Sequence, residues 1–155
     1  ETARTMRMFI EDGIRGIFIC GEQDMLEGYV IAKIWDDPTL DTDALLNEFF
    51  TRYFGAAAEP MKAFYLKIEE IATNPENYQR PCYRRNGIDW KNVAWTMLGT
   101  EERMKQLGEF MTQAQSMAQT DMEKQRVGLW RDTLWKWMEE GRAQYLTEEK
   151  KDDKS

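Results

Sequence analysis

The chain has 155 residues, a formal net charge of -7 and no histidine, and apolar residues make up 42% of it. This apolar content excludes a disordered chain, and no linker rich in Pro, Gly or Ser divides the sequence, so we expect one compact globular unit. The acidic charge argues against a nucleic-acid or membrane-surface partner, because such binding needs clustered Lys and Arg.

Cysteine and histidine usage also argues against a metal or cofactor site. Cys20 and Cys82 lack the spacing of metal ligands and allow at most one internal disulfide, and we expect two free, buried thiols. Without histidine, imidazole-ligated metal sites are excluded. No apolar run approaches the ~18 residues of a membrane span, and the N-terminus lacks a signal-peptide pattern. The absence of a starting Met fits an excised segment of a larger protein, so the missing signal says nothing about the compartment of the parent.

A helix followed by a short strand opens the chain. Thr2 is placed to cap a first helix, and Gly13 is placed to stop it. The apolar run from Ile17 to Cys20, bounded by Gly16 and Gly21, predicts a strand buried on both faces. The sequence indicates no other strand, and one strand cannot satisfy its own backbone groups. We therefore expect its sheet partners to lie outside this chain.

Helical periodicity dominates the rest of the sequence. We expect helices from Glu22 to Trp35, from the Asp41 cap to Phe54, and after Pro60, with an irregular surface region over residues 74–89. A short helix with Trp90, Val93, Ala94 and Met97 on its inner face then ends at Gly99.

Two long helices close the predicted architecture. Thr100 is placed to cap the first, and Thr120 with Glu123 forms a capping box for the second. Their short connection predicts an antiparallel hairpin. Trp130 and Trp137 lie on the predicted seam of the last helix, and Trp135 lies off it, where it could pack on another domain.

The predicted fold class is mainly α, with about seven helices and one orphan β-strand. The predicted regions are a helix–strand–helix segment over residues 1–38, a helical extension over 39–146 and a charged, frayed tail over 147–155, forming one compact unit.

The stretch from Gly16 to Tyr65 carries a family resemblance, through the residues Ala32-Lys33-Ile34-Trp35-Asp36-Asp37-Pro38, Asp41 to Phe50, Tyr53-Phe54-Gly55, Ala57-Ala58 and Met61. It resembles an uncharacterised bacterial family of glycoside-hydrolase-like proteins, distantly similar to α-glucuronidases. The resemblance implies that Ile17 to Cys20 form the last, or nearly last, strand of a (β/α)8 barrel and that the later helices form a layer after it. It also implies a periplasmic or extracellular location, with the remainder of the parent chain as partner.

Barrel enzymes carry their sites at the carboxyl ends of their strands, which here points to Glu22, Gln23 and Asp24 as sugar-contacting residues. The alternative is that Glu22 and Asp24 only favour the helix dipole in a first turn. Glycoside hydrolysis usually needs two carboxylates held ~5–9.5 Å apart, and in a barrel these normally come from different strands. We therefore expect no catalytic residue in this chain and no activity from the chain alone.

A second candidate site lies in the irregular region. Arg80, Arg84 and Arg85, interleaved with Tyr78, Tyr83 and Trp90, could bind an anionic sugar through bidentate guanidinium contacts. The alternative is a solvated loop whose arginines offset acidic neighbours.

Two functions remain open from the sequence. The first is the non-catalytic C-terminal portion of a carbohydrate-active protein, supporting a barrel and touching its ligand. The second is a helical interaction or scaffolding domain with no carbohydrate role.

Overall fold

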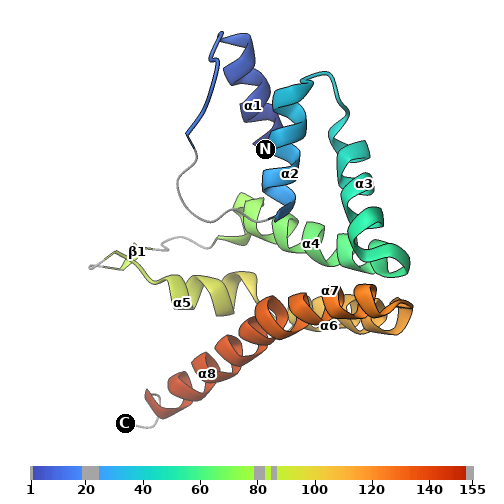
Figure 1. Cartoon of the computed structure of the whole chain (residues 1–155). Helices are drawn as coiled ribbons and strands as arrows, with labels where there is room; N and C mark the ends of the chain where they lie inside the picture. The colour runs from blue at the N-terminus through green and yellow to red at the C-terminus, as the bar shows by residue number, and fades with distance from the viewer. Residues whose placement is uncertain (1, 19–24, 79–82, 85–86, 153–155) are drawn as a thin grey trace. The chain divides into compact units, whose positions relative to one another are not determined.

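A computed structural model of the chain describes residues 2–18, 25–78, 83–84 and 87–152 (Figure 1). Helices predominate in these residues, and strands are limited there to β1 (Tyr83–Arg84) and β2 (Gly87–Ile88), which pair antiparallel. The predicted mainly α class is therefore confirmed. The small hairpin was not anticipated. The chain divides into two compact units, Glu1–Tyr53 (unit 1) and Phe54–Ser155 (unit 2), where the sequence predicts one.

Unit 1 is built from α1 (Thr2–Glu11), α2 (Met25–Asp36) and α3 (Thr42–Phe54), with α1 packed on α2. Its core contains apolar side chains from all three helices: Ala3, Met6, Leu26, Val30, Ile31, Ile34, Leu45, Phe49 and Phe50.

Gly13 ends α1, as predicted. It has a φ of +78°, which residues with a Cβ rarely adopt. Its N–H donates to the Ile10 carbonyl, and the Ile14 N–H donates to the Phe9 carbonyl, each at 3.0 Å, which is the Schellman pattern. Thr2 lies within α1, and its hydroxyl donates to Glu27 at 2.9 Å. In the structure it ties α1 to α2, which is not the capping role predicted for it.

The predicted strand from Ile17 to Cys20 is not found in its described half. Ile17 and Phe18 have no regular secondary structure, and the Phe18 side chain is 89% exposed. The expectation of a strand buried on both faces is therefore wrong for these two residues, because no sheet lies beside them in the described part of unit 1. Ile19 and Cys20 lie outside the described residues.

Arg7 holds the turn between α2 and α3. Its guanidinium donates to the Pro38 carbonyl at 2.9 Å and to the Leu40 carbonyl at 2.6 Å. Asp37 accepts hydrogen bonds from the Thr39 hydroxyl and backbone N–H, which lower the pKa of its carboxyl group. These contacts give the residues around Trp35-Asp36-Asp37-Pro38 a structural role as a helix stop.

The predicted Asp41 cap is confirmed, because its carboxylate accepts from the Ala44 N–H at 2.7 Å.

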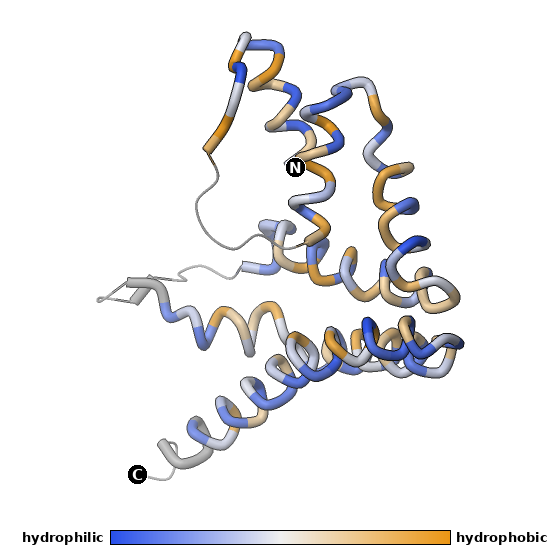
Figure 2. The backbone as a smooth tube through the Cα atoms, viewed as in Figure 1, coloured by the Kyte–Doolittle hydropathy of each residue, from blue (hydrophilic) through white to orange (hydrophobic). Residues whose placement is uncertain are grey.

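Unit 2 follows with η1 (Gly55–Ala57), α4 (Ala58–Thr73), η2 (Pro75–Asn77), the β1–β2 hairpin, α5 (Trp90–Asn92), the π-helical η3 (Val93–Leu98) and α6 (Glu101–Met117). It ends with α7 (Asp121–Trp130), the π-helical η4 (Arg131–Trp135) and α8 (Lys136–Asp152), which are continuous. Its core contains Phe54, Ala57, Ala58, Met61, Phe64, Ile71, Val93, Trp95, Met104, Leu107, Met111, Ala114, Ala118, Val127, Trp135 and Tyr145. Figure 2 shows that hydrophilic residues predominate along α8.

The helix α6 and the continuous helix after it run antiparallel. Gly108, in the middle of α6, lies against Trp135 of η4. Farther from the turn, Arg142 of α8 donates to the Gly99 carbonyl, just before α6, at 2.9 Å. The Thr100 cap and the Thr120–Glu123 capping box predicted for these helices are confirmed.

The tryptophans that are buried near the two π-helical segments differ from those that the sequence predicts. Trp95 is 8% exposed, whereas Trp90, which the sequence places on the inner face, is 66% exposed. Likewise Trp135 is 8% exposed and Trp137 is 63% exposed. The predicted seam of the last helix is therefore wrong at Trp137, because the π turn of η4 contains an extra residue and shifts the helix face that follows. Trp90 lies before η3, so the π turn there does not explain its exposure.

Candidate functional site

The segment from Ile14 to Phe18 is the most unusual surface of unit 1. It follows the chain reversal at Gly13, and its apolar residues extend into solvent, with Ile14 39% and Phe18 89% exposed. Figure 2 colours the end of this segment as hydrophobic. Within the described residues, no backbone hydrogen bond involves Gly16, Ile17 or Phe18. In the part of the chain that the structure describes, Gly16 to Phe18 thus have no backbone hydrogen-bond partner, and the Phe18 side chain lies in solvent.

Ile17 and Gly16 border an open hollow beside α2. Its other side is formed by Ile31, Ala32, Trp35 and Asp36. Ile31 is buried and Trp35 is half-buried, so the floor is apolar and fixed by the core of unit 1. This surface can take an apolar partner, and it carries one acidic residue at its edge.

Tyr29 lies on another side of α2, against α3. Its ring is 5.6 Å from that of Phe49, and the Lys33 ammonium lies over it at 5.6 Å. The hydroxyl is buried without a hydrogen-bond partner of ordinary geometry in the described structure. Burial and the nearby Glu48 carboxylate raise the pKa of Tyr29, so the neutral phenol is favoured. This arrangement packs two helices and gives no nucleophile.

The structure does not place most of the predicted site residues. Glu22, Gln23, Asp24, Arg80 and Arg85 lie outside the described residues, as do Cys20 and Cys82. Arg84 lies in β1, where its backbone pairs with Gly87, and its side chain is not described. The two predicted ligand-binding clusters therefore stay predictions.

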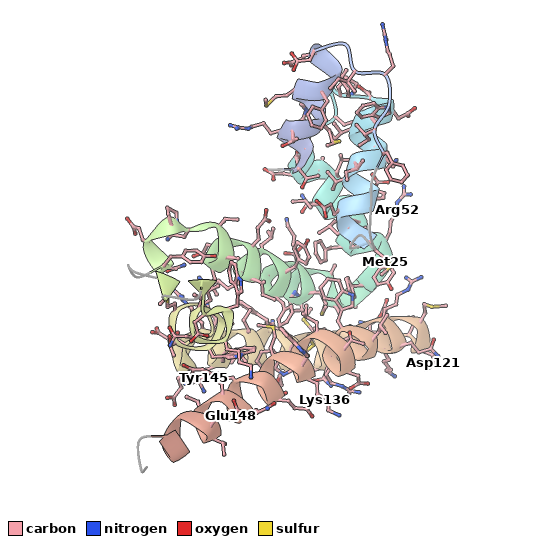
Figure 3. All side chains as sticks on the ribbon, turned by 90° about the vertical axis from the view of Figure 1, so that its left-hand side faces the viewer. Met25, Arg52, Asp121, Lys136, Tyr145 and Glu148 are labelled. Carbon is pink, nitrogen blue, oxygen red and sulfur yellow. The ribbon has the colours of Figure 1, made fainter. Side chains whose placement is uncertain are left out.

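Two aromatic residues predicted near the arginine cluster are described. The Tyr78 hydroxyl donates to the Ala72 carbonyl at 2.6 Å, so this hydrogen bond holds the Tyr78 ring at the end of α4. Trp90 is 66% exposed at the start of α5. Next to it, Asn92 donates to the Tyr145 hydroxyl at 3.0 Å and Lys91 pairs with Glu148 at 3.7 Å, which ties α5 to α8 (Figure 3).

The described residues contain no group of three or more His, Cys, Asp or Glu side chains arranged to hold a metal ion. No polar or charged residue is fully buried among them. None of the described helices combines the length and apolar character needed to cross a bilayer.

Two arginines of unit 2 hydrogen-bond the backbone at the end of η3, a role that the sequence did not reveal. Arg103 donates to the carbonyls of Met97 and Leu98 and to the side chain of Asn77, and Arg142 covers the next carbonyl, at Gly99. The end of η3 is thus fixed by two guanidinium groups. The sequence signal for this region is Gly141, because a glycine inside a helix is less favourable than alanine and therefore calls for a packing reason.

No protein-family model matches the sequence, and comparisons with curated proteins and with solved structures give no match either.

Proposed function

We propose that this chain is the non-catalytic C-terminal portion of a carbohydrate-active, glycoside-hydrolase-like protein. In this proposal Ile17 to Cys20 become a strand of a barrel formed mostly by other residues of the parent protein. The helices after about residue 39 support that barrel, and Glu22 to Asp24 lie at its ligand-binding end. The sequence resemblance around Trp35-Asp36-Asp37-Pro38 supplies the carbohydrate part of the proposal.

The exposure of Phe18 is the observation that carries the proposal. A phenylalanine that is 89% exposed forgoes the free energy that burial of its ring would give, and among the described residues Gly16, Ile17 and Phe18 have no backbone hydrogen-bond partner. A neighbouring strand supplies both missing partners at once, since it hydrogen-bonds the backbone and buries the alternate side chains.

Phe18→Ala tests the structural half of the proposal in two contexts. In the isolated 155-residue chain the exposed ring contributes little, and we expect the free energy of unfolding to change by less than about 0.5 kcal/mol. In the full-length gene product the ring is buried, and we expect a loss of about 3–5 kcal/mol. Chemical denaturation of both proteins measures the difference.

Phe50→Ala is the matched control, because Phe50 is 1% exposed and should be costly to truncate in both contexts. A small effect of Phe18→Ala in the full-length product would contradict the proposal. So would a gene product that has no residues beyond this chain.

The carbohydrate half is tested by Glu22→Gln in the full-length product, with Glu11→Gln at an exposed position of α1 as control. We expect Glu22→Gln to weaken binding to a glycan array at least tenfold, because a carboxylate that accepts hydrogen bonds from sugar hydroxyls is replaced by a neutral amide. Equal glycan binding by the Glu22→Gln and Glu11→Gln variants would show that Glu22 does not contact the ligand. Absence of glycan binding by the wild type would favour the second candidate function.

That second candidate is a helical interaction domain with no carbohydrate role. It is favoured by the exposed apolar residues of α7, where Met122 and Leu129 are 55% and 51% exposed one heptad apart on the same helix face. The coding sequence upstream discriminates between the two, since about 250 residues or more of alternating strands and helices would indicate a barrel. Their absence would favour an interaction domain.

A further inference from the structure

We propose that unit 2 contains a binding site for a small, neutral aromatic molecule, in an apolar pocket of about 200 Å³ that is partly open to solvent and is lined by α4, η3, α6 and the η4–α8 junction. This site is separate from the surface around Phe18, and it does not depend on the carbohydrate proposal.

The cavity wall is apolar. Ile68 and Ile71 line it from α4, Leu107 from α6 and Leu134 from η4, and no charged side chain is part of the wall. Water against this wall would find almost no hydrogen-bond partner on the protein, so the pocket favours an apolar occupant. Ala94 is half-buried in the wall and Ala72 lies at its exposed edge, and a larger side chain at either position would extend over the space.

Trp95 forms a rigid wall of the cavity. A Cβ at Gly141 would lie 2.6 Å from its Cζ2 atom, and a Cβ at Gly99 would lie 3.1 Å from its Cε3 atom. Two glycines therefore let the indole occupy this position. Trp137 lies at the rim, 63% exposed, with its ring 5.7 Å from that of Trp95 and tilted by 55°. The cavity thus has an aromatic wall and an aromatic mouth.

Both π-helical segments border this cavity. In η3 the Gly99 N–H donates to the Ala94 carbonyl at 2.7 Å, five residues back, and in η4 the Lys136 N–H bonds to the Arg131 carbonyl in the same way. Such turns are rare and are frequently found at functional sites. Two of them at one cavity, each supplying lining residues, are an independent indication of a ligand site.

The size and chemistry of the cavity select the ligand class. A dry cavity of about 150 Å³ lined by aliphatic and aromatic side chains accepts benzene, so a space slightly larger fits one substituted ring. The two tryptophans offer edge and face contacts that aromatic rings prefer. A charged ring would lose its hydration without gaining a partner.

Toluene is the probe, with benzoate as its charged counterpart. We expect toluene to shift the methyl NMR signals of Ile68 and Leu134 in a saturable way and to raise the melting temperature of the wild-type chain. Benzoate at the same concentrations should do neither. No saturable shift up to the solubility limit of toluene would overturn the proposal.

Ala94→Leu fills the cavity from η3 and should weaken toluene binding at least tenfold. Ala72→Leu fills it from α4, and it keeps the test valid if the first variant does not fold. Ala143→Leu, at an exposed position facing a different hollow of unit 2, is the matched control and should bind toluene as the wild type does. Unchanged binding in a folded, cavity-filling variant would contradict the assignment.

Discussion

Glu123 shows how much one surface carboxylate can organise. Its side chain accepts hydrogen bonds from the backbone N–H groups of Gln119 at 2.7 Å and Thr120 at 3.2 Å, and from Ala56 of η1 at 3.4 Å. The first two belong to the turn before α7, and the third belongs to a segment more than sixty residues away in the chain. The capping motif visible in the sequence therefore also fixes a tertiary contact that the sequence did not reveal.

These N–H groups, with that of Gln119 first, lower the pKa of Glu123. A depressed pKa in the folded state means that the carboxylate stabilises the fold at pH values above the ordinary Glu pKa. This contribution is lost as the pH falls through the depressed pKa. We expect Glu123→Gln to lower the melting temperature near neutral pH, and we expect the difference from wild type to shrink below about pH 4. Thermal unfolding across this pH range measures it.

Glu109→Gln, at an exposed position of α6, is the control and should follow the wild-type curve. A gap between Glu123→Gln and wild type that stays constant with pH would show that the charge plays no part.

Gly141 and Gly128 give opposite predictions for one substitution in the same continuous helix. Alanine at Gly141 would place its Cβ 2.6 Å from Trp95, and overpacking of this kind costs about 1–3 kcal/mol. At Gly128 a Cβ meets nothing within 4 Å, so alanine should stabilise the helix by about 0.5–1 kcal/mol. Urea denaturation of both variants tests this, and equal effects would contradict the packing described around Trp95.

At the scale of elements, most helix boundaries could be predicted because their signals are local. Gly13, Asp41, Thr100 and Thr120 each act through hydrogen bonds within a few residues, and each behaves as predicted. The buried face of a helix is less predictable where its geometry changes. A heptad count carried through η4 assigns Trp137 to the interior, and the extra residue of the π turn brings Trp135 there.

The consequence for stability can be measured on the two tryptophans. Trp135 is buried against Gly108, and its ring meets that of Phe64 at 6.0 Å. Trp135→Ala should cost about 3–5 kcal/mol. Trp137→Ala removes a largely exposed ring and one aromatic contact, and it should cost about 1 kcal/mol. If denaturant unfolding shows that Trp137→Ala costs more free energy than Trp135→Ala, the helix follows the uninterrupted heptad register and the burial described here is wrong.

At the scale of the whole molecule, composition and periodicity were enough to predict a mainly α chain. They could not predict its division near Tyr53 and Phe54, because no Pro- or Gly-rich linker marks that point and α3 is continuous through it. The strand predicted from Ile17 to Cys20 fails at Ile17 and Phe18 for a physical reason. β-structure needs a neighbouring strand, and a sequence pattern reports only that a residue suits one.

The candidate site could be predicted only in part, because a sequence pattern does not show which segments become neighbours in the fold. The sequence identified the apolar run beginning at Ile17 as a surface in need of partners, and the exposure of Phe18 agrees with that need. The sequence did not anticipate the cavity beside Trp95. Its walls come from segments far apart in the chain, and the π turns that shape them leave no clear composition signal.

The central claim is that the segment from Gly16 to Phe18 is completed by structure from outside this chain. Hydrogen–deuterium exchange at these amides tests it most directly, with the amides of Met104 to Met111 in α6 as a protected reference in both samples. We predict near-unprotected exchange in the isolated chain and at least about hundredfold slower exchange in the full-length gene product. Equally fast exchange in both proteins would contradict the claim.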